Sequence, residues 1–410
     1  MIALTLALAV AQTASAAPPQ DDEGKTIVVT AKRLDVTKKA LDACIARACP
    51  PDEEVAAALA HAENQFVEGE YKAARHTLHG TIGRVDRRAK EYPVAVANIW
   101  RAESRISAHL GEDRSMRSSQ LQAIDALKAG LPATDDRVLL QRLQVADTFL
   151  RQGKVEMGLA GYHTVVRQAR GKKNAAVEGT ALLRIALVYS ALAGMPASAL
   201  DPQTRFGASD ANFRDAKRAV KALLDTTDPQ LAGFRDAGRL LDARLDAVKG
   251  DMRGIEAIAA NYARDRPSQA ILLYAPLLDD RGTFFDPNRV KLLGEPDFVD
   301  QWVDVTFLVD ANGRVKEVEV LRESPRLRND WVKPVLASVT ARRYAPLEFD
   351  PGLDGMRRVE RYTMTAAWGL GATGTNMRVR MGQPRLEMLD LTADPPRTAS
   401  SGTSQPSPAE

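Results

Sequence analysis

The chain has 410 residues, too many for one ordinary hydrophobic core, so we expect at least two folded units. Apolar residues make up 45% of it, which is enough to bury those cores. Its 56 basic and 53 acidic residues leave a formal charge of +3. This near balance excludes the strongly basic surface of a general nucleic-acid-binding protein, and we expect no nucleic-acid partner.

The first 16 residues are typical of a signal peptide. The apolar run from Ile2 to Ala11 is too short to cross a bilayer, and Ala14-Ser15-Ala16 supplies small residues at a cleavage site. No Lys or Arg precedes the run, so an uncleaved anchor stays open as an alternative. After cleavage we expect no membrane span and a periplasmic location in a Gram-negative cell.

The only two cysteines, Cys44 and Cys49, lie five residues apart just before Pro50-Pro51. On one continuous helix their side chains would point about 140° apart, so a bond requires the helix to end between them. The two prolines favour such an ending. In an oxidising compartment we expect a local disulfide here, with two free thiols as the alternative. Without partner histidines the pair predicts no metal site.

Residues 36–266 have apolar positions at three- and four-residue spacing, which predicts amphipathic helices. Glycines punctuate them at regular intervals: Gly69, Gly111 and Gly153 are each 42 residues apart, and Gly194 follows 41 later. Gly250 comes after a longer gap of 56. A period of this length indicates stacked helical hairpins, an all-α solenoid.

The first of these units resembles a tetratricopeptide repeat. Gly69-Glu70-Tyr71-Lys72-Ala73-Ala74 reproduces the Gly-x-Tyr-x-x-Ala word of that family, in which Gly permits a tight turn and Tyr71 fills the wedge between two helices. The later units keep the glycine and lose the tyrosine, and their period exceeds the family's usual length of about 34 residues. The resemblance implies a surface that binds peptides or partner proteins; the alternative is an array that only supports the C-terminal domain.

A second domain follows a linker at residues 267–296. Val303, Val305, Phe307 and Val309 alternate with Asp304, Thr306 and Leu308, which predicts a half-buried strand. Asn312-Gly313 predicts a hairpin, because both residues tolerate positive φ, and a second strand continues to Leu321. A helix with Trp331 on its apolar face and a strand at residues 358–366 complete a small α+β domain of order β-β-α-β over residues 297–393. The tail at residues 394–410 is polar and expected to be disordered.

This order of elements resembles the C-terminal domain of the TonB energy transducers. The resemblance rests on four words: Val303-Asp304-Val305-Thr306-Phe307, Asn312-Gly313-Arg314-Val315, Val318-Glu319-Val320-Leu321 and Arg343-Tyr344-Ala345-Pro346. The resemblance implies a periplasmic domain whose last strand pairs with the TonB box of an outer-membrane receptor. Carried over to this chain, the peptide-binding edge would comprise Val359, Arg361, Tyr362, Thr363 and Thr365. A further predicted hairpin, with strands at 377–381 and 386–391 around Gly382-Gln383-Pro384, could instead cover that edge.

The extended N-terminal segment, residues 17–35, contains a word that resembles the TonB box itself. Its core is Ile27, Val28, Val29, Thr30 and Ala31, and such β-branched residues suit addition to the edge of a sheet. We expect it to pair with a TonB or with this protein's own C-terminal sheet; a chance occurrence is the alternative.

No catalytic motif is present, and the C-terminal domain contains no His to activate a nucleophile, so we expect no enzyme activity and no cofactor. His76 and His79, in the helical half, are interpreted as a surface pair. Two hypotheses remain. The first is a transport-related adapter whose partners are proteins or peptides, including TonB-dependent receptors or a TonB. The second is a structural scaffold whose TonB-like domain is a closed cap without a peptide ligand.

Overall fold

The structure is a computed structural model that describes residues 34–194, 209–276, 301–325, 327, 329–350, 352–370 and 378–392. The predicted signal peptide, the TonB-box-like core at residues 27–31 and the polar tail lie outside the described residues. The predicted boundary between linker and second domain, at residue 297, also lies outside them.

Helices fill the first part of the chain, and each packs against the next one in sequence. Their bounds are α1 Leu34–Ala46, α2 Pro51–Val67, α3 Tyr71–Val85, α4 Pro93–His109, α5 Asp113–Gly130, α6 Asp136–Arg151, α7 Val155–Gly171, α8 Ala175–Gly194, α9 Ser209–Leu224, α10 Ala232–Val248 and α11 Arg253–Tyr262, with short 3-10 turns η1 Asp86–Arg88 and η3 Pro229–Leu231. The predicted helical-hairpin array is therefore confirmed.

The periodic glycines mark the turns of the hairpins. Gly69, Gly111, Gly153 and Gly250 all have positive φ, at 81°, 71°, 73° and 90°, and they join α2 to α3, α4 to α5, α6 to α7 and α10 to α11. Gly194 is the last residue of α8, and the link that follows it lies outside the described residues. The sequence period thus corresponds to one hairpin per unit.

Helix α8 is long and apolar enough, by length and composition alone, to cross a membrane, with half of its apolar window buried. Its place in the array accounts for that composition, because it packs against α7, α9 and α10. Arg184 of α8 is buried and forms an ion pair with Asp147 of α6. A charged side chain paired inside the protein is typical of a core helix in a helical array.

A four-stranded antiparallel sheet of order β3-β2-β5-β6 forms the C-terminal part. Its strands are β2 Gln301–Val309, β3 Val315–Glu323, β5 Met356–Leu370 and β6 Arg378–Asp390; helix α13 Asn329–Thr340 covers one face, and a separate pair of short strands comprises β1 Leu272–Tyr274 and β4 Arg343–Tyr344. The predicted fold class, a helical-hairpin solenoid followed by a small α+β domain, is confirmed.

The hairpin between β2 and β3 forms where it was predicted, with a different turn. The carboxylate of Asp310 accepts hydrogen bonds from the backbone N–H groups of Asn312 and Arg314, each at 2.9 Å. Among the turn residues only Gly313 has positive φ, at 74°. This pattern matches a three-residue turn that ends in a left-handed glycine. Asn312 lies in the turn but does not adopt the positive φ that was expected of it.

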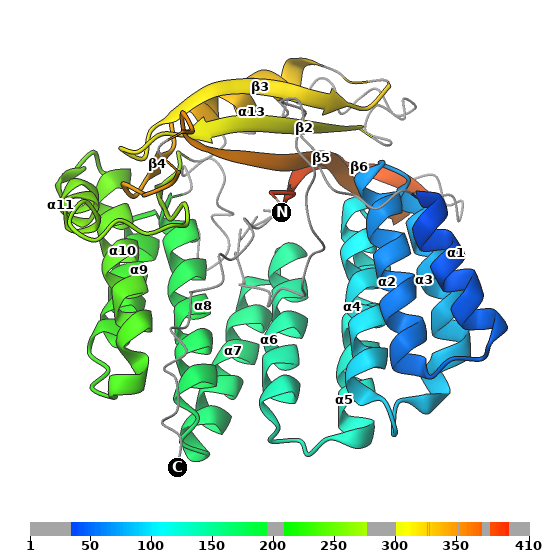
Figure 1. The fold of residues 1–410 in the computed structure, drawn as a ribbon. Helices are drawn as coiled ribbons and strands as arrows, with labels where there is room; N and C mark the ends of the chain where they lie inside the picture. The colour runs from blue at the N-terminus through cyan, green and yellow to red at the C-terminus, as the bar shows by residue number, and fades with distance from the viewer. Residues whose placement is uncertain are drawn as a thin grey trace, which may run out of the picture.

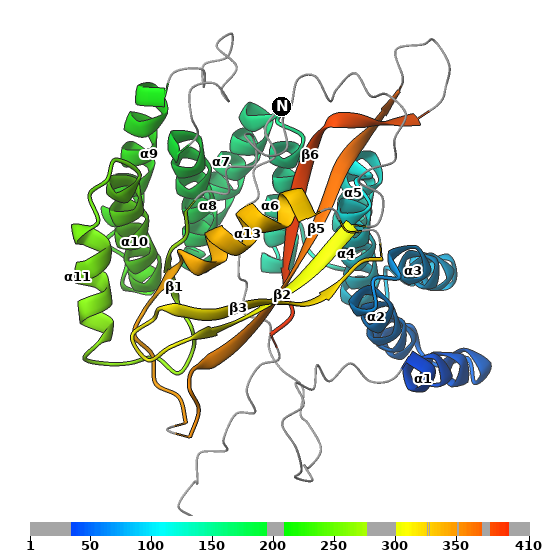
Figure 2. The same ribbon diagram turned by 90° about the horizontal axis from the view of Figure 1, so that it is seen from above.

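The sheet lies across the ends of the helices that carry the hairpin turns. Figure 1 shows it arching over the array, with α2 and α3 beneath one end and α10 and α11 beneath the other. Seen from above in Figure 2, α13 lies on the outer side of the sheet, and the helices follow a curve below it. The two parts of the chain therefore form one body with a junction at each end of the sheet.

Candidate functional site

Both faces of β2 are buried, because α13 packs on one and the array on the other. Val303, Val305 and Phe307 join the core beneath α13. Trp302 joins the core of the first hairpins instead. The prediction that this strand exposes a polar face is wrong, since Asp304 and Thr306 are buried as well. A polar face covered by protein requires partners for every charge, and the junction supplies them.

Arg361 of β5 is at the centre of the first junction, which we call the main junction. It donates to the two carboxylate oxygens of Asp304 at 2.7 and 2.9 Å, and neither side chain has exposed surface. It also donates to the backbone carbonyls of Phe66 at 2.6 Å and Val67 at 2.7 Å, the last two residues of α2. Carbonyls at the end of a helix lack partners within the helix, so this cation caps α2 while it pairs with the sheet.

Aromatic rings enclose this cation. The guanidinium carbon of Arg361 lies 3.9 Å from the centre of the Trp302 ring and 5.9 Å from that of Phe66. Trp302 also lies against the turn glycine of the first hairpin, because a Cβ added to Gly69 would come within 2.6 Å of its Nε1 atom. The absence of a side chain at Gly69 is therefore needed twice, for the turn and for the approach of the sheet.

Thr363, two residues beyond Arg361, joins two helices to the sheet. Its hydroxyl lies 2.9 Å from the hydroxyl of Tyr71 in α3 and 3.1 Å from Nδ1 of His109 in α4. Tyr71 is buried, as predicted from the repeat word, and it stacks on Phe66 with ring centres 4.7 Å apart. Burial lowers the pKa of His109 to about 4, so the ring is neutral near pH 7 and can accept a hydrogen bond from Thr363.

The edge strand β6 reaches a third hairpin. Arg151, the last residue of α6, donates to both carboxylate oxygens of Glu387 at 2.6 Å. Arg322 of β3 adds a contact on the other side, with Nη2 at 3.3 Å from the carbonyl of Val67. The main junction thus extends from α2 to α6 and involves strands β2, β3, β5 and β6.

The opposite end of the sheet domain is anchored on α10 and α11. Arg244 of α10 donates to the carbonyls of Leu272 and Leu273 in β1 at 2.5 and 2.7 Å. Leu273 and Ala345 share a buried cluster with residues of α10 and α11. Strand β1, which the sequence placed in the linker, is therefore the second attachment point of the sheet domain.

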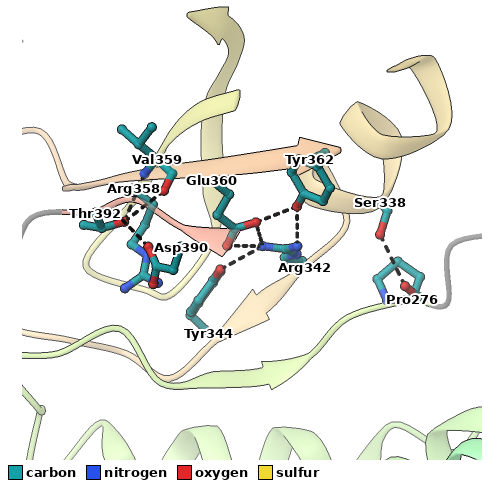
Figure 3. Close-up of polar contacts among 10 residues, drawn as sticks. All are labelled: Pro276, Ser338, Arg342, Tyr344, Arg358, Val359, Glu360, Tyr362, Asp390 and Thr392. Carbon is teal, nitrogen blue, oxygen red and sulfur yellow. Dashed lines mark hydrogen bonds and ion pairs between the residues drawn. The ribbon is translucent and has the colours of Figure 1, made fainter. Parts of the chain in front are cut away.

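A second polar cluster lies on the α13 face of β5 (Figure 3). Arg342 donates to both oxygens of Glu360 at 2.8 and 2.9 Å and to the hydroxyl of Tyr362 at 2.8 Å. Tyr362 donates to Glu360 at 2.5 Å, and burial together with the Glu360 charge raises its pKa well above the ordinary value. The Glu360 carboxylate thus accepts hydrogen bonds from two side chains. Because Arg342 follows α13 and Glu360 lies in β5, the cluster connects the end of α13 to the sheet.

The predicted peptide-binding edge is paired on both sides, so that prediction is wrong for this sheet. The five residues named for it, Val359, Arg361, Tyr362, Thr363 and Thr365, belong to β5, which pairs with β2 on one side and β6 on the other. Even at the end of the ladder the backbone of Val359 is engaged, as its N–H donates to Thr392 Oγ1 at 3.0 Å and its carbonyl accepts from Leu391 at 2.8 Å.

The residues named for that edge have other places in the structure. Arg361 and Thr363 face the array, and Tyr362 faces α13. The covering element is a single strand, β6, and not the predicted separate hairpin at residues 377–391. Pro384 lies within β6 opposite Ala366, which an edge strand tolerates because its outer backbone groups need no partner.

The remaining predicted residues are placed as follows. Cys44 and Cys49 are joined by a disulfide, with Cα atoms 5.2 Å apart, and α1 ends at Ala46 between them. Glu53 lies beside the two sulfurs, but sulfurs bonded to each other do not supply thiolate ligands. His79 has an acidic partner that the sequence analysis missed, since its Nε2 atom lies 3.3 Å from the buried carboxylate of Glu103 in α4.

The sequence analysis missed Trp302, Asp304 and His109 as junction residues. The available signal was weak: an acid and a threonine that alternate with apolar positions look the same whether water or protein covers them. Trp302 and Leu308, at the two ends of the series that contains Asp304 and Thr306, were the apolar residues out of pattern.

No family model matches this chain, and no curated protein matches it. Among solved structures, the crystal structure of BtubC (BKLC) from P. vanneervenii is similar over 58% of this chain and 91% of that one, with 13% identity and a TM-score of 0.39. Similarity at this level indicates neither a function nor a partner.

Proposed function

We propose that this protein is a non-catalytic periplasmic scaffold, in which the C-terminal sheet holds the helical array in one curvature and the array binds a partner protein. The observation that carries the proposal is the burial of Arg361 between Asp304 and the carbonyls that end α2. Separating the two parts would remove both helix-end acceptors from Arg361 and would expose Trp302, which packs in the core of the first hairpins; both changes are unfavourable. A sheet fixed in this way supports a closed cap better than an independent peptide-binding module.

The adapter hypothesis, in which a TonB box or similar peptide adds a strand to the C-terminal sheet at β5, has less support. Such a peptide would have to displace β6 along a ladder that runs from Glu360 and Asp390 to Leu370 and Arg378. It would also break the ion pair between Arg151 and Glu387. The C-terminal domain still resembles that of TonB, but the proposal does not include TonB-type peptide binding.

Two features of the chain support the proposed location. The apolar run at Ile2–Ala11 resembles a signal sequence, and the bond between Cys44 and Cys49 belongs to an oxidising compartment. The proposed absence of catalysis rests on the lack of a catalytic motif in the sequence.

The test combines peptide titration with cross-linking in the exported full-length protein. TonB-box peptides are added while hydrogen exchange of β6 is followed, and the scaffold proposal expects no change. Photo-reactive residues are placed in cells at exposed apolar positions of the array, Leu121, Leu140 and Met157, which are 44%, 37% and 50% exposed.

The expected result is a protein adduct at one or more of these positions that is lost in Arg361→Met, with Leu353 of the sheet domain, 58% exposed, as the matched control position. Faster exchange of β6 on peptide addition would instead support the adapter. The absence of adducts at every array position would contradict partner binding by the array.

A further inference from the structure

The outer edge of β3 is the side of the sheet on which we find no neighbouring strand among the described residues. β3 is a terminal strand in the order β3-β2-β5-β6, and β2 is its only strand partner within the described part of the chain. Five of its nine residues are exposed: Lys316, Glu317, Glu319, Val320 and Glu323. The other terminal strand, β6, instead contacts α6 through Glu387. An open strand edge presents backbone N–H and C=O groups that can pair with another strand.

Among the described residues, this edge carries acidic side chains that no cation compensates. Lys316 forms an ion pair with Asp310 at 3.0 Å, and Arg322 forms one with Asp304 at 2.8 Å. Within the part of the chain that the structure describes, Glu317, Glu319 and Glu323 have no ion-pair partner. Three acidic side chains along nine residues would repel a second acidic edge and favour a basic strand.

The shape of β3 restricts what can pair with it. Its register with β2 shifts twice, and Glu317 has a positive φ of 50°, which marks a bulge. Between the bulge and the end of the strand lies Val320, 39% exposed. Bulges and charges are devices that prevent indiscriminate pairing of sheet edges. The part of the β3 edge that can still pair with another strand is therefore short, and it contains one exposed apolar residue, Val320, among acidic ones.

The described chain begins near the end of this strand. Thr37, one turn into α1, accepts a hydrogen bond from Asn64 of α2 at 3.2 Å, so the start of α1 lies beside the last turn of α2. Arg322 of β3 reaches the carbonyl of Val67 at that same turn. Figure 1 shows α1 and α2 beneath this end of the sheet. With neighbouring helix axes 8–10 Å apart, Leu34 and the end of β3 are separated by roughly 15 Å.

We propose that residues 25–29 add to the outer edge of β3 as a fifth strand, with residues 30–33 as the link to Leu34. The strand and its link, residues 25–33, contain Lys25, Lys32 and Arg33 and no acid, a charge of +3 that complements the three glutamates of β3. Its centre, Ile27-Val28-Val29, is β-branched and suited to a strand. An extended chain spans about 3.4 Å per residue, so four or five residues bridge the distance from Leu34 and leave Ile27 to Val29 beside the C-terminal half of β3.

The direction of the added strand follows from the same geometry. The segment is tethered at its C-terminal end to Leu34, which lies near the C-terminal end of β3. The two strands therefore run parallel, and Val320 lies beside the apolar centre of the segment. This pairing is distinct from the proposed binding of a partner by the array, and it leaves the main junction unchanged.

Hydrogen exchange of the full-length exported protein tests the proposal. The amides of residues 318–323 are compared in the wild type, in Val28→Pro, which removes a backbone donor from the centre of the segment, and in Asp22→Pro, a matched proline outside it. The expected result is exchange about tenfold faster or more in Val28→Pro than in the other two. Amides of α3 and β5 at the main junction serve as the internal reference and should not change.

A charge exchange supplies the second arm. Replacing Lys25, Lys32 and Arg33 by Glu should increase exchange in β3, and replacing Glu317, Glu319 and Glu323 by Lys in the same chain should restore protection. Equal exchange in the wild type and Val28→Pro overturns the proposal. Protection that grows with protein concentration, together with a doubled mass in solution, also overturns it, because the occupant of the edge is then a second copy.

Discussion

The hydroxyl groups of Tyr71 and Thr363 lie 2.9 Å apart although 292 residues separate them in the sequence. Tyr71 belongs to the word that resembles a tetratricopeptide repeat, and Thr363 belongs to the strand that resembles the last strand of the TonB domain. The residues that carry the two resemblances are therefore in contact with each other. The two segments were expected to form separate binding surfaces. Their contact indicates that they instead form the two sides of one junction.

The main junction predicts a large cost for removing its central cation. In Arg361→Met, the buried Asp304 keeps only its ion pair with Arg322 and two helix-end carbonyls lose a donor, so we expect the free energy of unfolding to fall by about 3 kcal/mol. Urea denaturation followed by circular dichroism measures the change. Arg170→Met removes an exposed pair with Glu178 and is the control, with an expected effect below about 1 kcal/mol. Equal effects of the two substitutions would contradict the central place given to Arg361.

Two turn glycines separate the cost of backbone strain from the cost of contact. Gly250 has a φ of 90° and no atom within 4 Å of an added Cβ, so Gly250→Ala should lower the unfolding free energy by about 1–2 kcal/mol. Gly69→Ala should cost more, because its Cβ would also meet the ring of Trp302. Urea denaturation of Gly250→Ala and Gly69→Ala measures the two losses, through the urea concentration at which each variant is half unfolded. In a Trp302→Ala background the difference between the two alanine substitutions should shrink, and a constant difference would rule out the ring as its cause.

The main features of the fold could be predicted from the sequence because they rest on local signals. The glycine period predicted the hairpins, because each turn needs a positive φ at a single position and glycine is the residue that adopts it most easily. The hairpin after Val309 and the helix around Trp331 followed from alternation and helical spacing in the same way. What local signals could not provide was the partner of a polar residue. Asp304 pairs with Arg361, 57 positions away, and nothing in the pattern around Asp304 distinguishes a solvated strand face from a covered one.

The edge of β5 was mispredicted for a related reason. Gly382-Gln383-Pro384 has the composition of a turn, and it lies inside β6 because a terminal strand tolerates a missing donor. Whether such a segment turns or continues depends on the strand beside it, which the sequence does not identify.

The buried histidine predicts a loss of stability in mild acid. The pKa of His109 is about 4 in the folded protein and about 6.5 in the unfolded chain, so protonation favours the unfolded state. Its contribution is complete above pH 6.5 and is lost as the pH falls from 6.5 towards 4, with about 2 kcal/mol lost at pH 5. Denaturation at pH 7.5 and pH 5 measures this loss. His109→Gln should retain a smaller pH dependence, and an unchanged one would assign the effect to other groups.

The disulfide reports the compartment. In cells that export the protein, Cys44 and Cys49 should resist alkylation by a thiol-reactive mass tag until a reductant is added. A chain that lacks residues 1–16 should stay in the cytosol and react fully. Because the closed loop is short, Cys44→Ser with Cys49→Ser should lower the unfolding free energy by about 2 kcal/mol or less. Free thiols in the exported protein would argue against the periplasmic assignment.

The attachment of β5 to α2, α3 and α4 sets an order on biogenesis. A chain that emerges from the ribosome N-terminus first presents the first hairpins long before residue 361 is available, so the end of α2 lacks the Arg361 donor and Phe66 lacks the cover of the sheet. Until the final quarter of the polypeptide arrives, the earliest part remains vulnerable to proteases and to association with other nascent chains. Termination shortly before β5 would thus compromise the opposite end of the molecule, and quality control of this protein should depend on its last strands.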